Sequence, residues 1–303
     1  MDRKKIVKNT KRFMARLALQ ICSLIVRFLP KEAIYGFIKL TARLGFFIAG
    51  RHRRIALEGL KNAFGKEKTA AQIKSIARDC FTFMAESGAE LVFLTDRPAL
   101  IKKVVSFVGK DNLDTALAKG KGVVLVSAHF GNFPLLMIKL SLEGYKIAGI
   151  MRYARDEKAE KIFYEKRQRV GIKTIYSQPR KACVEESIRT LRNNELLFIP
   201  LDQNFGTGGV FVDFFGRKAA TATGPVVLAL RTGAAILPCF IVRNQDNTHK
   251  IIFEPEFKLE KAGAFQETVL INTQRMTNII ERYIRRYPAH WGWIHRRWKT
   301  QKG

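Results

Sequence analysis

The sequence predicts an α/β protein with a mixed, largely parallel sheet flanked by helices, and three observations predict it. First, 47% of the 303 residues are apolar, which is enough to fill a large core and excludes a disordered chain. Second, short apolar runs alternate with amphipathic segments from about residue 100 onward, as in chains that form parallel sheets. Third, the runs 122–128 and 195–201 are almost wholly apolar, which is typical of strands covered on both faces.

The remaining elements follow in the same alternation. We expect strands at 122–128, 146–151, 172–176, 195–201, 234–243 and 249–257. We expect helices at 133–142, 156–169, 179–193, 224–232 and 263–286. We expect a loop at the glycine-bearing segment 206–222. Its glycine-rich start, 206–209, does not have the strand–turn–helix pattern of a dinucleotide site, and we expect this part to be mobile.

The net charge of the chain is +28, from 54 Lys and Arg against 26 Asp and Glu. Residues 1–54 hold 14 Lys and Arg and 2 acidic residues, and residues 281–303 hold 7 and 1. Such a surplus favours an anionic partner. A nucleic-acid-binding protein is the non-enzyme alternative, but the cations lie among large aliphatic residues and no known module is recognisable, so we expect no nucleic acid.

The N-terminal segment 11–29 is expected to form a helix with a narrow cationic strip, which includes Arg12, Arg16 and Arg27, and a wide apolar face. Its longest uncharged run has 10 residues, whereas a spanning helix needs about 20. A helix lying in the membrane interface fits better, with a steeper insertion left open. The interrupting arginines and the missing small-residue cleavage site speak against a signal peptide.

A second amphipathic stretch, 34–49, precedes the cationic cluster of Arg51, Arg53 and Arg54. We therefore divide the chain into a basic, amphipathic membrane-anchor region, 1–54, and an α/β domain with its preceding helices, 55–303. The alternative is a basic helical pair that packs on the domain. The four cysteines are far apart, which argues against a zinc cluster or a disulfide framework, and we expect neither a metal nor a cofactor.

Polar residues follow two of the buried strands, where α/β proteins gather ligands. His129 and Asn132 come after the strand 122–128, and Asp202, Gln203 and Asn204 come after the strand 195–201. Of these, we expect Asn132, Gln203 and Asn204 to contact the substrate. His129 lies just before an expected helix, whose N-terminal dipole would disfavour imidazolium and keep a neutral base. The alternative is a histidine that only satisfies nearby backbone groups.

Several motifs occur in a fixed order. They are Ser127-Ala-His-Phe-Gly-Asn132, Asp202-Gln-Asn-Phe-Gly206, Val210-Phe-Val-Asp-Phe-Phe-Gly216, Thr232-Gly-Ala-Ala235 and Trp291-Gly-Trp-Ile-His-Arg-Arg-Trp-Lys299. Together they resemble the late acyltransferases of lipid A biosynthesis, in the lysophospholipid acyltransferase superfamily. The resemblance runs from about residue 15 to residue 300.

The resemblance implies a glycerol-phosphate-acyltransferase-like fold at the cytoplasmic face of the bacterial inner membrane. It implies transfer of a fatty acyl group from acyl carrier protein, or coenzyme A, to a hydroxyl of a lipid A precursor, with His129 as general base. Phosphate groups and an acidic carrier protein would both suit the charge of +28. The apolar residues 210–215 would then line an acyl-chain slot, or else belong to the core.

The chain departs from the family motif at one position. The family has an acidic residue five positions after the histidine, and this chain has Pro134 there. Three hypotheses follow. Asp202 substitutes for the missing acid, His129 works without an orienting carboxylate, or the protein is a non-catalytic lipid-binding homologue.

Other residues are candidates for substrate or membrane contact. Arg152 and Arg155 follow a strand end and would suit an acceptor phosphate or sugar, or else form an exposed helix start. The basic, aromatic tail with Arg296, Arg297 and Trp298 would contact the membrane or an anion, while Trp291 and Trp293 could pack on the core. Glu86 and Glu90, one helical turn apart, are expected to form structural salt bridges.

The acceptor itself is not fixed by the sequence. A lysophospholipid, an amino-acid lipid or a phosphoinositol mannoside would require the same chemistry. The length of the acyl chain is equally open.

Overall fold

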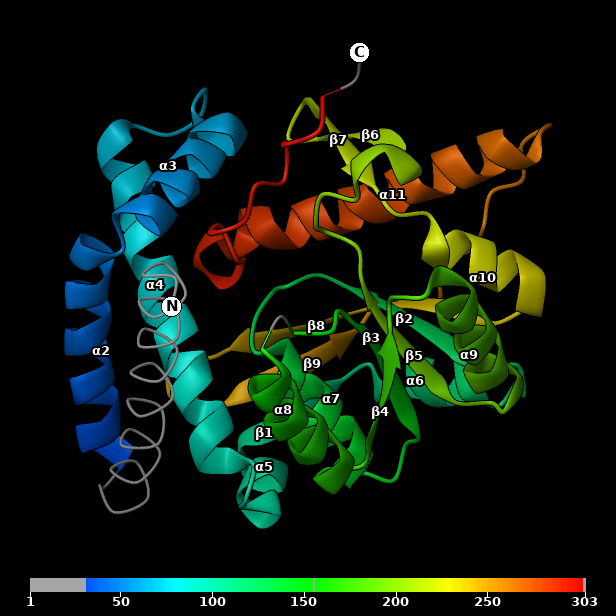
Figure 1. The fold of residues 1–303 in the computed structure, drawn as a ribbon, viewed down its shortest axis with the longest axis horizontal. Coiled ribbons are helices and arrows are strands. Elements are labelled where there is room, and N and C mark those ends of the chain that lie inside the picture. The colour runs from blue at the N-terminus through cyan, green and yellow to red at the C-terminus, as the bar shows by residue number, and fades with distance from the viewer. Residues whose placement is uncertain (1–30, 155, 302–303) are drawn as a thin grey trace, which may run out of the picture.

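The computed structural model describes residues 31–154 and 156–301. They form a seven-stranded sheet with helices on both faces, next to a group of N-terminal helices (Figure 1). The strand order is β1-β9-β8-β2-β5-β3-β4, and every pair is parallel except β8 with β9. The predicted α/β class with a mixed, largely parallel sheet is thus confirmed.

The strands lie close to their expected positions. They are β1 (Val105–Val108), β2 (Val123–Ser127), β3 (Ile147–Met151), β4 (Ile172–Tyr176), β5 (Leu196–Pro200), β8 (Ala235–Arg243) and β9 (His249–Phe253). Within this sheet, only the four-residue edge strand β1 has no counterpart among the expected strands.

The sheet is covered on both faces because successive side chains of a strand point to opposite sides. In β2, Val124 and Val126 belong to one hydrophobic core, and Val123 and Leu125 belong to the other. The first core also includes residues of α9 (Arg180–Arg192), α10 (Gly224–Thr232) and α11 (Phe265–Arg286). The second includes residues of α5 (Pro98–Val104), α6 (Lys110–Leu117) and α7 (Phe133–Leu142). The charged helix α8 (Glu157–Arg169) connects β3 with β4.

Three helices precede this sandwich, α2 (Lys31–Ile48), α3 (Gly50–Phe64) and α4 (Ala70–Leu94). The helix α4 begins at a capping box in which Thr69 and Gln72 satisfy each other's backbone N–H groups. The expected boundary after residue 54 falls inside α3, whose second half is buried in the first core. The expected helix 11–29, with Arg12, Arg16 and Arg27, lies outside the described residues. None of the described helices is long and apolar enough to span a bilayer.

The segment 206–222 is not the loop that we expected. A 3-10 turn (Gly206–Gly208) leads into an antiparallel hairpin of β6 (Val210–Phe214) and β7 (Arg217–Thr221) that packs on α11 (Figure 1). Both turn residues, Phe215 and Gly216, have positive φ (54° and 68°), as a tight two-residue hairpin turn requires. Val212 and Phe214 are buried, so these apolar residues serve the core.

The C-terminal tail folds back onto the first core. Trp291, Trp293 and Trp298 are all buried, and Trp291 and Trp293 meet edge to face with ring centroids 4.5 Å apart. The packing of Trp291 and Trp293 is the core alternative stated above. Trp298 was expected at a membrane or an anion, and this is wrong, because its Nε1 donates to the Phe214 carbonyl inside the core.

The tail makes a prediction for stability. Trp293 is 1% exposed and packs against Phe64, Phe215 and Gly59. Trp293→Ala should therefore lower the free energy of unfolding by about 3–5 kcal/mol. Urea titration measures this loss. Phe265→Ala, at a side chain 58% exposed, is the control and should change stability by less than about 1 kcal/mol.

Candidate active site

His129 and Asp202 meet because their strands are neighbours in register. Ser127 of β2 pairs with Pro200 of β5, and the Leu201 N–H donates to the Ser127 carbonyl at 2.9 Å. His129 and Asp202 each lie two residues beyond the end of their strand, and His129 Nδ1 is 2.9 Å from Asp202 Oδ1. Asp202 is therefore within hydrogen-bonding distance of the imidazole, as the hypothesis that it substitutes for the missing motif acid requires.

Every oxygen of the Asp202 carboxylate has a donor. Oδ1 also accepts from the His129 backbone N–H at 3.0 Å, and Oδ2 accepts from Trp291 Nε1 at 2.6 Å. Burial alone would raise the pKa of Asp202, but the charge and hydrogen bonds of His129 outweigh it and hold that pKa below its usual range. A fully buried carboxylate thus stays ionised beside the imidazole.

The same contact sets the protonation of His129. Burial lowers the pKa of His129, but the charge of Asp202 and its hydrogen bond outweigh burial, and the net shift is upward. The depressed pKa that we expected from the helix dipole is thus wrong in direction. The side chain of His129 keeps 32% exposure. With Nδ1 engaged by the carboxylate, Nε2 is the nitrogen left to exchange a proton with a ligand.

The turn 129–132 is fastened to the tail by backbone hydrogen bonds. The Gly131 N–H donates to the His290 carbonyl at 2.8 Å, and the Gly292 N–H donates to the His129 carbonyl at 3.1 Å. Gly131 has φ +62°, and a Cβ there would lie 2.0 Å from the Ile241 carbonyl oxygen. Only glycine fits at residue 131. The backbone conformation of this glycine directs the chain from the turn into α7.

The structure separates the remaining strand-end candidates. Gln203 is exposed beside the pair, and Asn204 is half-buried and binds the tail through Thr300. Asn132 was expected to contact substrate, but its side chain is buried and its amide nitrogen donates to Glu90 and to the Ser87 carbonyl. Asn132 therefore belongs to the scaffold of the turn.

The cationic candidates separate in the same way. Arg152 and Arg296 are exposed, and Arg155 lies outside the described residues. Arg297 is not a membrane or anion contact, because its buried guanidinium donates to the Gln203 and Ala220 carbonyls and to Thr221 Oγ1. Burial lowers the pKa of Arg297 to about 10. Its cation fixes the loop after Asp202 to β7.

Sequence reasoning missed two partners of the pair. Trp291 supplies a hydrogen bond to Asp202 across 89 positions, which no local pattern shows. His295 meets the Trp291 ring at 5.7 Å, and burial lowers the pKa of His295 to about 4, so it is neutral above that pH. The tail motif was the only signal for both.

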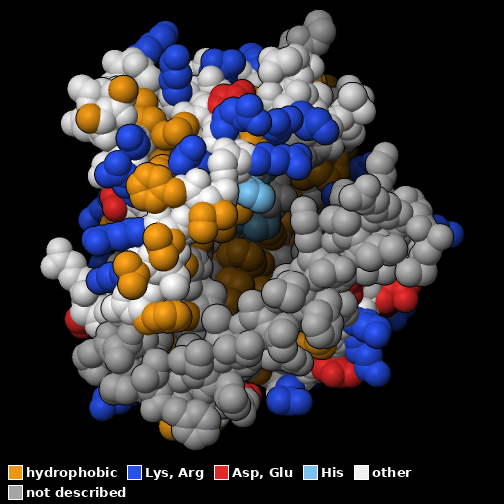
Figure 2. All heavy atoms as spheres, turned by 60° about the vertical axis from the view of Figure 1, so that its left-hand side comes forward, with side chains coloured by type: hydrophobic (Ala, Val, Ile, Leu, Met, Phe, Trp, Pro, Cys, Tyr) orange, Lys and Arg blue, Asp and Glu red, His pale blue; other side chains and the backbone are white. Residues whose placement is uncertain are grey.

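The N-terminal helices carry apolar and cationic side chains together on the surface. On α2 these are Phe37, Leu40, Leu44, Phe47 and Ile48, with Lys39 and Arg43. Arg51 and Arg54 of α3 are exposed, whereas Arg53 turns back to the Phe46 and Phe47 carbonyls. Figure 2 shows a face with such side chains around a hollow that has apolar atoms at its floor and histidine at its rim.

A partly exposed imidazole held by a buried carboxylate thus lies at the carboxyl edge of a largely parallel sheet, where α/β enzymes bind their ligands. The family of bacterial lipid A biosynthesis acyltransferases matches residues 1–300, and the chain belongs to that family.

Individual relatives differ in how much they align. The palmitoleoyltransferase of lipid A biosynthesis from Escherichia coli is 27% identical over 83% of this chain and 80% of its own length. The lauroyltransferase of the same organism is 24% identical over 94% and 91%. A phosphatidylinositol mannoside acyltransferase of Mycobacterium tuberculosis is 32% identical over 43% of this chain, and the match spans less than half (42%) of that relative.

The turn 129–132 makes a prediction of its own. In Gly131→Ala the new methyl group collides with the Ile241 carbonyl at positive φ, so the turn must move. We expect a loss of more than about 1 kcal/mol in the free energy of unfolding and a lowered turnover. Gly88→Ala is the control, because a Cβ at this helical position meets nothing within 4 Å. Thermal unfolding and activity are measured on both variants. Equal changes in Gly131→Ala and Gly88→Ala would contradict the prediction.

Proposed function

We propose that the protein transfers a fatty acyl group from a thioester donor to a hydroxyl of a lipid A precursor or a related glycolipid, with His129 as general base. The observation that carries this proposal is the 2.9 Å contact between His129 Nδ1 and Asp202 Oδ1, in a side chain that keeps 32% exposure. Membership of the acyltransferase family supports it.

The proposed reaction needs one proton acceptor. Nε2 of His129 takes the proton of the acceptor hydroxyl, and the alkoxide oxygen attacks the thioester carbonyl carbon. The tetrahedral intermediate collapses, the C–S bond breaks, and the thiolate leaves with the proton from the imidazolium. Asp202 holds the ring in the tautomer with Nδ1 protonated and stabilises the imidazolium between the two proton transfers.

The negative charge on the tetrahedral intermediate needs hydrogen-bond donors. The helix α7 begins at Phe133, and Asn132 at its N-cap position makes no capping hydrogen bond to it with its side chain. Its first-turn N–H groups, with the positive end of the helix dipole, are candidates for stabilising that charge. Pro134 removes one of these donors.

The donor and acceptor are inferred from charge and from the relatives. Acyl carrier protein is acidic and coenzyme A carries phosphates, so either donor suits a chain of net charge +28. The Escherichia coli relatives favour a lipid A precursor as acceptor. The mycobacterial match favours a phosphoinositol mannoside as the second candidate. Exposed Gln203 and Arg152 are candidates to contact the acceptor.

We place the protein on the cytoplasmic face of the bacterial inner membrane. The apolar side chains of α2 would enter the interface, while Lys39, Arg43, Arg51 and Arg54 meet anionic headgroups. Each such cation contributes about 1 kcal/mol of attraction. The division into an anchor and a catalytic domain stays a prediction.

Acyl transfer by purified variants tests the proposed base. His129→Ala should lower turnover by about 10²–10⁴-fold, and Asp202→Asn should lower it in the same range because the tautomer is no longer fixed. The assay uses an acyl thioester and a lipid A precursor, and Asp213→Asn at an exposed surface ion pair is the control. Wild-type turnover in both site variants would refute the proposal.

The raised pKa of His129 gives a pH dependence. Because the base must be neutral, kcat/KM should fall as the pH drops through the raised pKa, with a midpoint above the ordinary value of about 6.5. Asp202→Asn removes the charge that raises this pKa, so the midpoint should move to lower pH. Values of kcat/KM measured across roughly pH 5–9, which covers the ordinary and the shifted pKa values of histidine, give this midpoint. An unmoved midpoint would show that another group titrates.

A further inference from the structure

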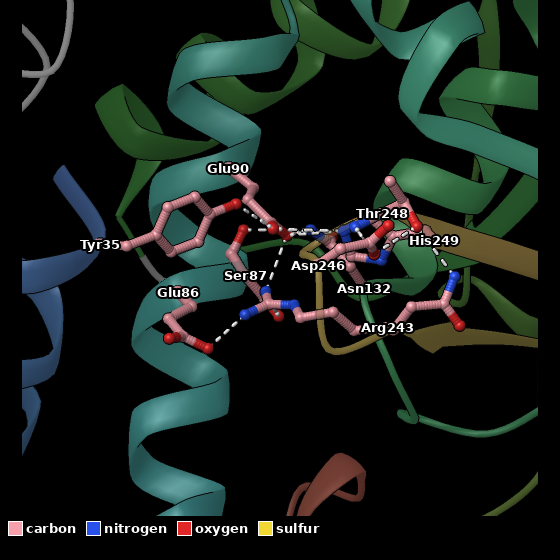
Figure 3. A network of polar contacts seen from close by, with 10 residues as sticks. Tyr35, Glu86, Ser87, Glu90, Asn132, Arg243, Asp246, Thr248 and His249 are labelled. Carbon is pink, nitrogen blue, oxygen red and sulfur yellow. Dashed lines mark hydrogen bonds and ion pairs between the residues drawn. The ribbon is translucent and has the colours of Figure 1, made fainter. Parts of the chain in front are cut away.

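A buried polar network lies on the side of the turn 129–132 that faces the N-terminal helices (Figure 3). Its centre is the carboxylate of Glu90 on α4, which is 4% exposed. Glu90 accepts hydrogen bonds from Tyr35 Oη at 2.7 Å, Asn132 Nδ2 at 3.0 Å and Arg243 Nη2 at 2.8 Å, and His249 Nε2 lies 3.2 Å away. Four segments of the chain therefore converge on one carboxylate.

The charge at this centre is held in place by its partners. Burial would raise the pKa of Glu90, but the hydrogen bond and charge of His249 and the charge of Arg243 outweigh it, and the net shift is downward. Arg243 is itself buried, with 5% of its side chain exposed. An ionised carboxylate is thus available to Asn132.

Asn132 is the member that reaches the active site. It stands at the N-cap of α7, where asparagine commonly accepts a hydrogen bond from the helix's own first turn, yet it makes no such bond. Its amide instead points to Glu90 and to the Ser87 carbonyl. The next residue, Phe133, meets the His129 ring edge to face at 5.2 Å. A displacement of Asn132 would therefore displace the residue that packs on the imidazole.

We propose that Glu90 is a positioning residue for His129, acting through Asn132 and the turn 129–132. The inference rests on the proposed function, and it assigns to α4 a part in the reaction. On one side Asp202 holds the imidazole, and on the other Glu90 holds the end of the turn. Through Tyr35 the same carboxylate connects the turn to α2, the helix with the exposed apolar and cationic face.

The helix α4 offers a matched control one turn earlier. Glu86 is 7% exposed and forms an ion pair with the same Arg243, but it makes no hydrogen bond to Asn132 in the part of the chain that the structure describes. A role that consisted only of the buried ion pair with Arg243 would make Glu86 and Glu90 comparable. The positioning role separates them.

The kinetic test compares Glu90→Gln with Glu86→Gln. Glutamine offers one acceptor oxygen where Glu90 offers two, so it cannot serve all the donors. We expect kcat to fall about 10–100-fold in Glu90→Gln, because small misplacements of a catalytic group are costly, with KM within about two-fold of wild type. Glu86→Gln should keep kcat within about two-fold of wild type. Equal losses of kcat in the two variants would overturn the proposal.

A titration that does not depend on activity completes the test. NMR of histidine-labelled protein measures the imidazole pKa of His129, and His129→Ala assigns its signal. This pKa should fall in Glu90→Gln, because a displaced ring loses part of its contact with Asp202, and it should stay unchanged in Glu86→Gln. Asn132→Ala leaves every charge in place and should lower it as well. The double variant Glu90→Gln/Asn132→Ala should lower the pKa of His129 no further than Glu90→Gln alone, because both changes break the same contact between Glu90 and Asn132. Additive shifts, or an unchanged pKa in Asn132→Ala, would overturn the proposal.

The kinetic measurement and the NMR titration distinguish a failure of the proposed function from a failure of the proposed role of Glu90. If the wild-type protein transfers no acyl group, the proposed function fails, and the titration still decides whether Glu90 positions His129. If Glu90→Gln does not fold, Asn132→Ala still decides the question by kcat and by titration.

Discussion

The buried carboxylate of Asp202 is the constraint on which the site depends. A buried, ionised group is stable only where hydrogen-bond donors surround it, and these donors come from two distant parts of the chain. His129 supplies its ring and its backbone N–H from the end of β2, and Trp291 supplies its indole N–H from the tail. The tail must therefore close over the sheet before the site is complete. The C-terminal motif, residues 291–299, therefore helps to build the candidate site from a distant part of the chain.

The central part of the fold could be predicted from the sequence because its signal is local. Helices at 133–142 and 224–232 and the strand 172–176 lie where the hydrophobic pattern puts them. The hairpin 210–221 was missed because its glycines were taken as marks of a mobile loop, whereas they flank strands whose apolar side chains fill the core. The short strand β1 was missed because four residues carry too little periodicity.

The site could be predicted in part. The strand ends identified His129 and Asp202, and register then brought them together. The pairing of Glu86 and Glu90 with Arg243 confirms the expected salt bridges, although the partner lies about 150 positions away and could not be named. The predictions for Arg297 and Trp298 were wrong because alternating cationic and aromatic residues fit two environments equally well. They occur at a membrane interface, and they occur in a core where buried carbonyl groups need hydrogen-bond donors.

The tautomer of His129 is the most direct test of this account. Nitrogen-15 NMR of the imidazole, recorded above its pKa, distinguishes a ring protonated at Nδ1 from one protonated at Nε2. The proton should lie on Nδ1, donated to Asp202, with the lone pair of Nε2 free to accept the proton of a hydroxyl. A ring protonated at Nε2, or one that averages both tautomers as free histidine does, would contradict it.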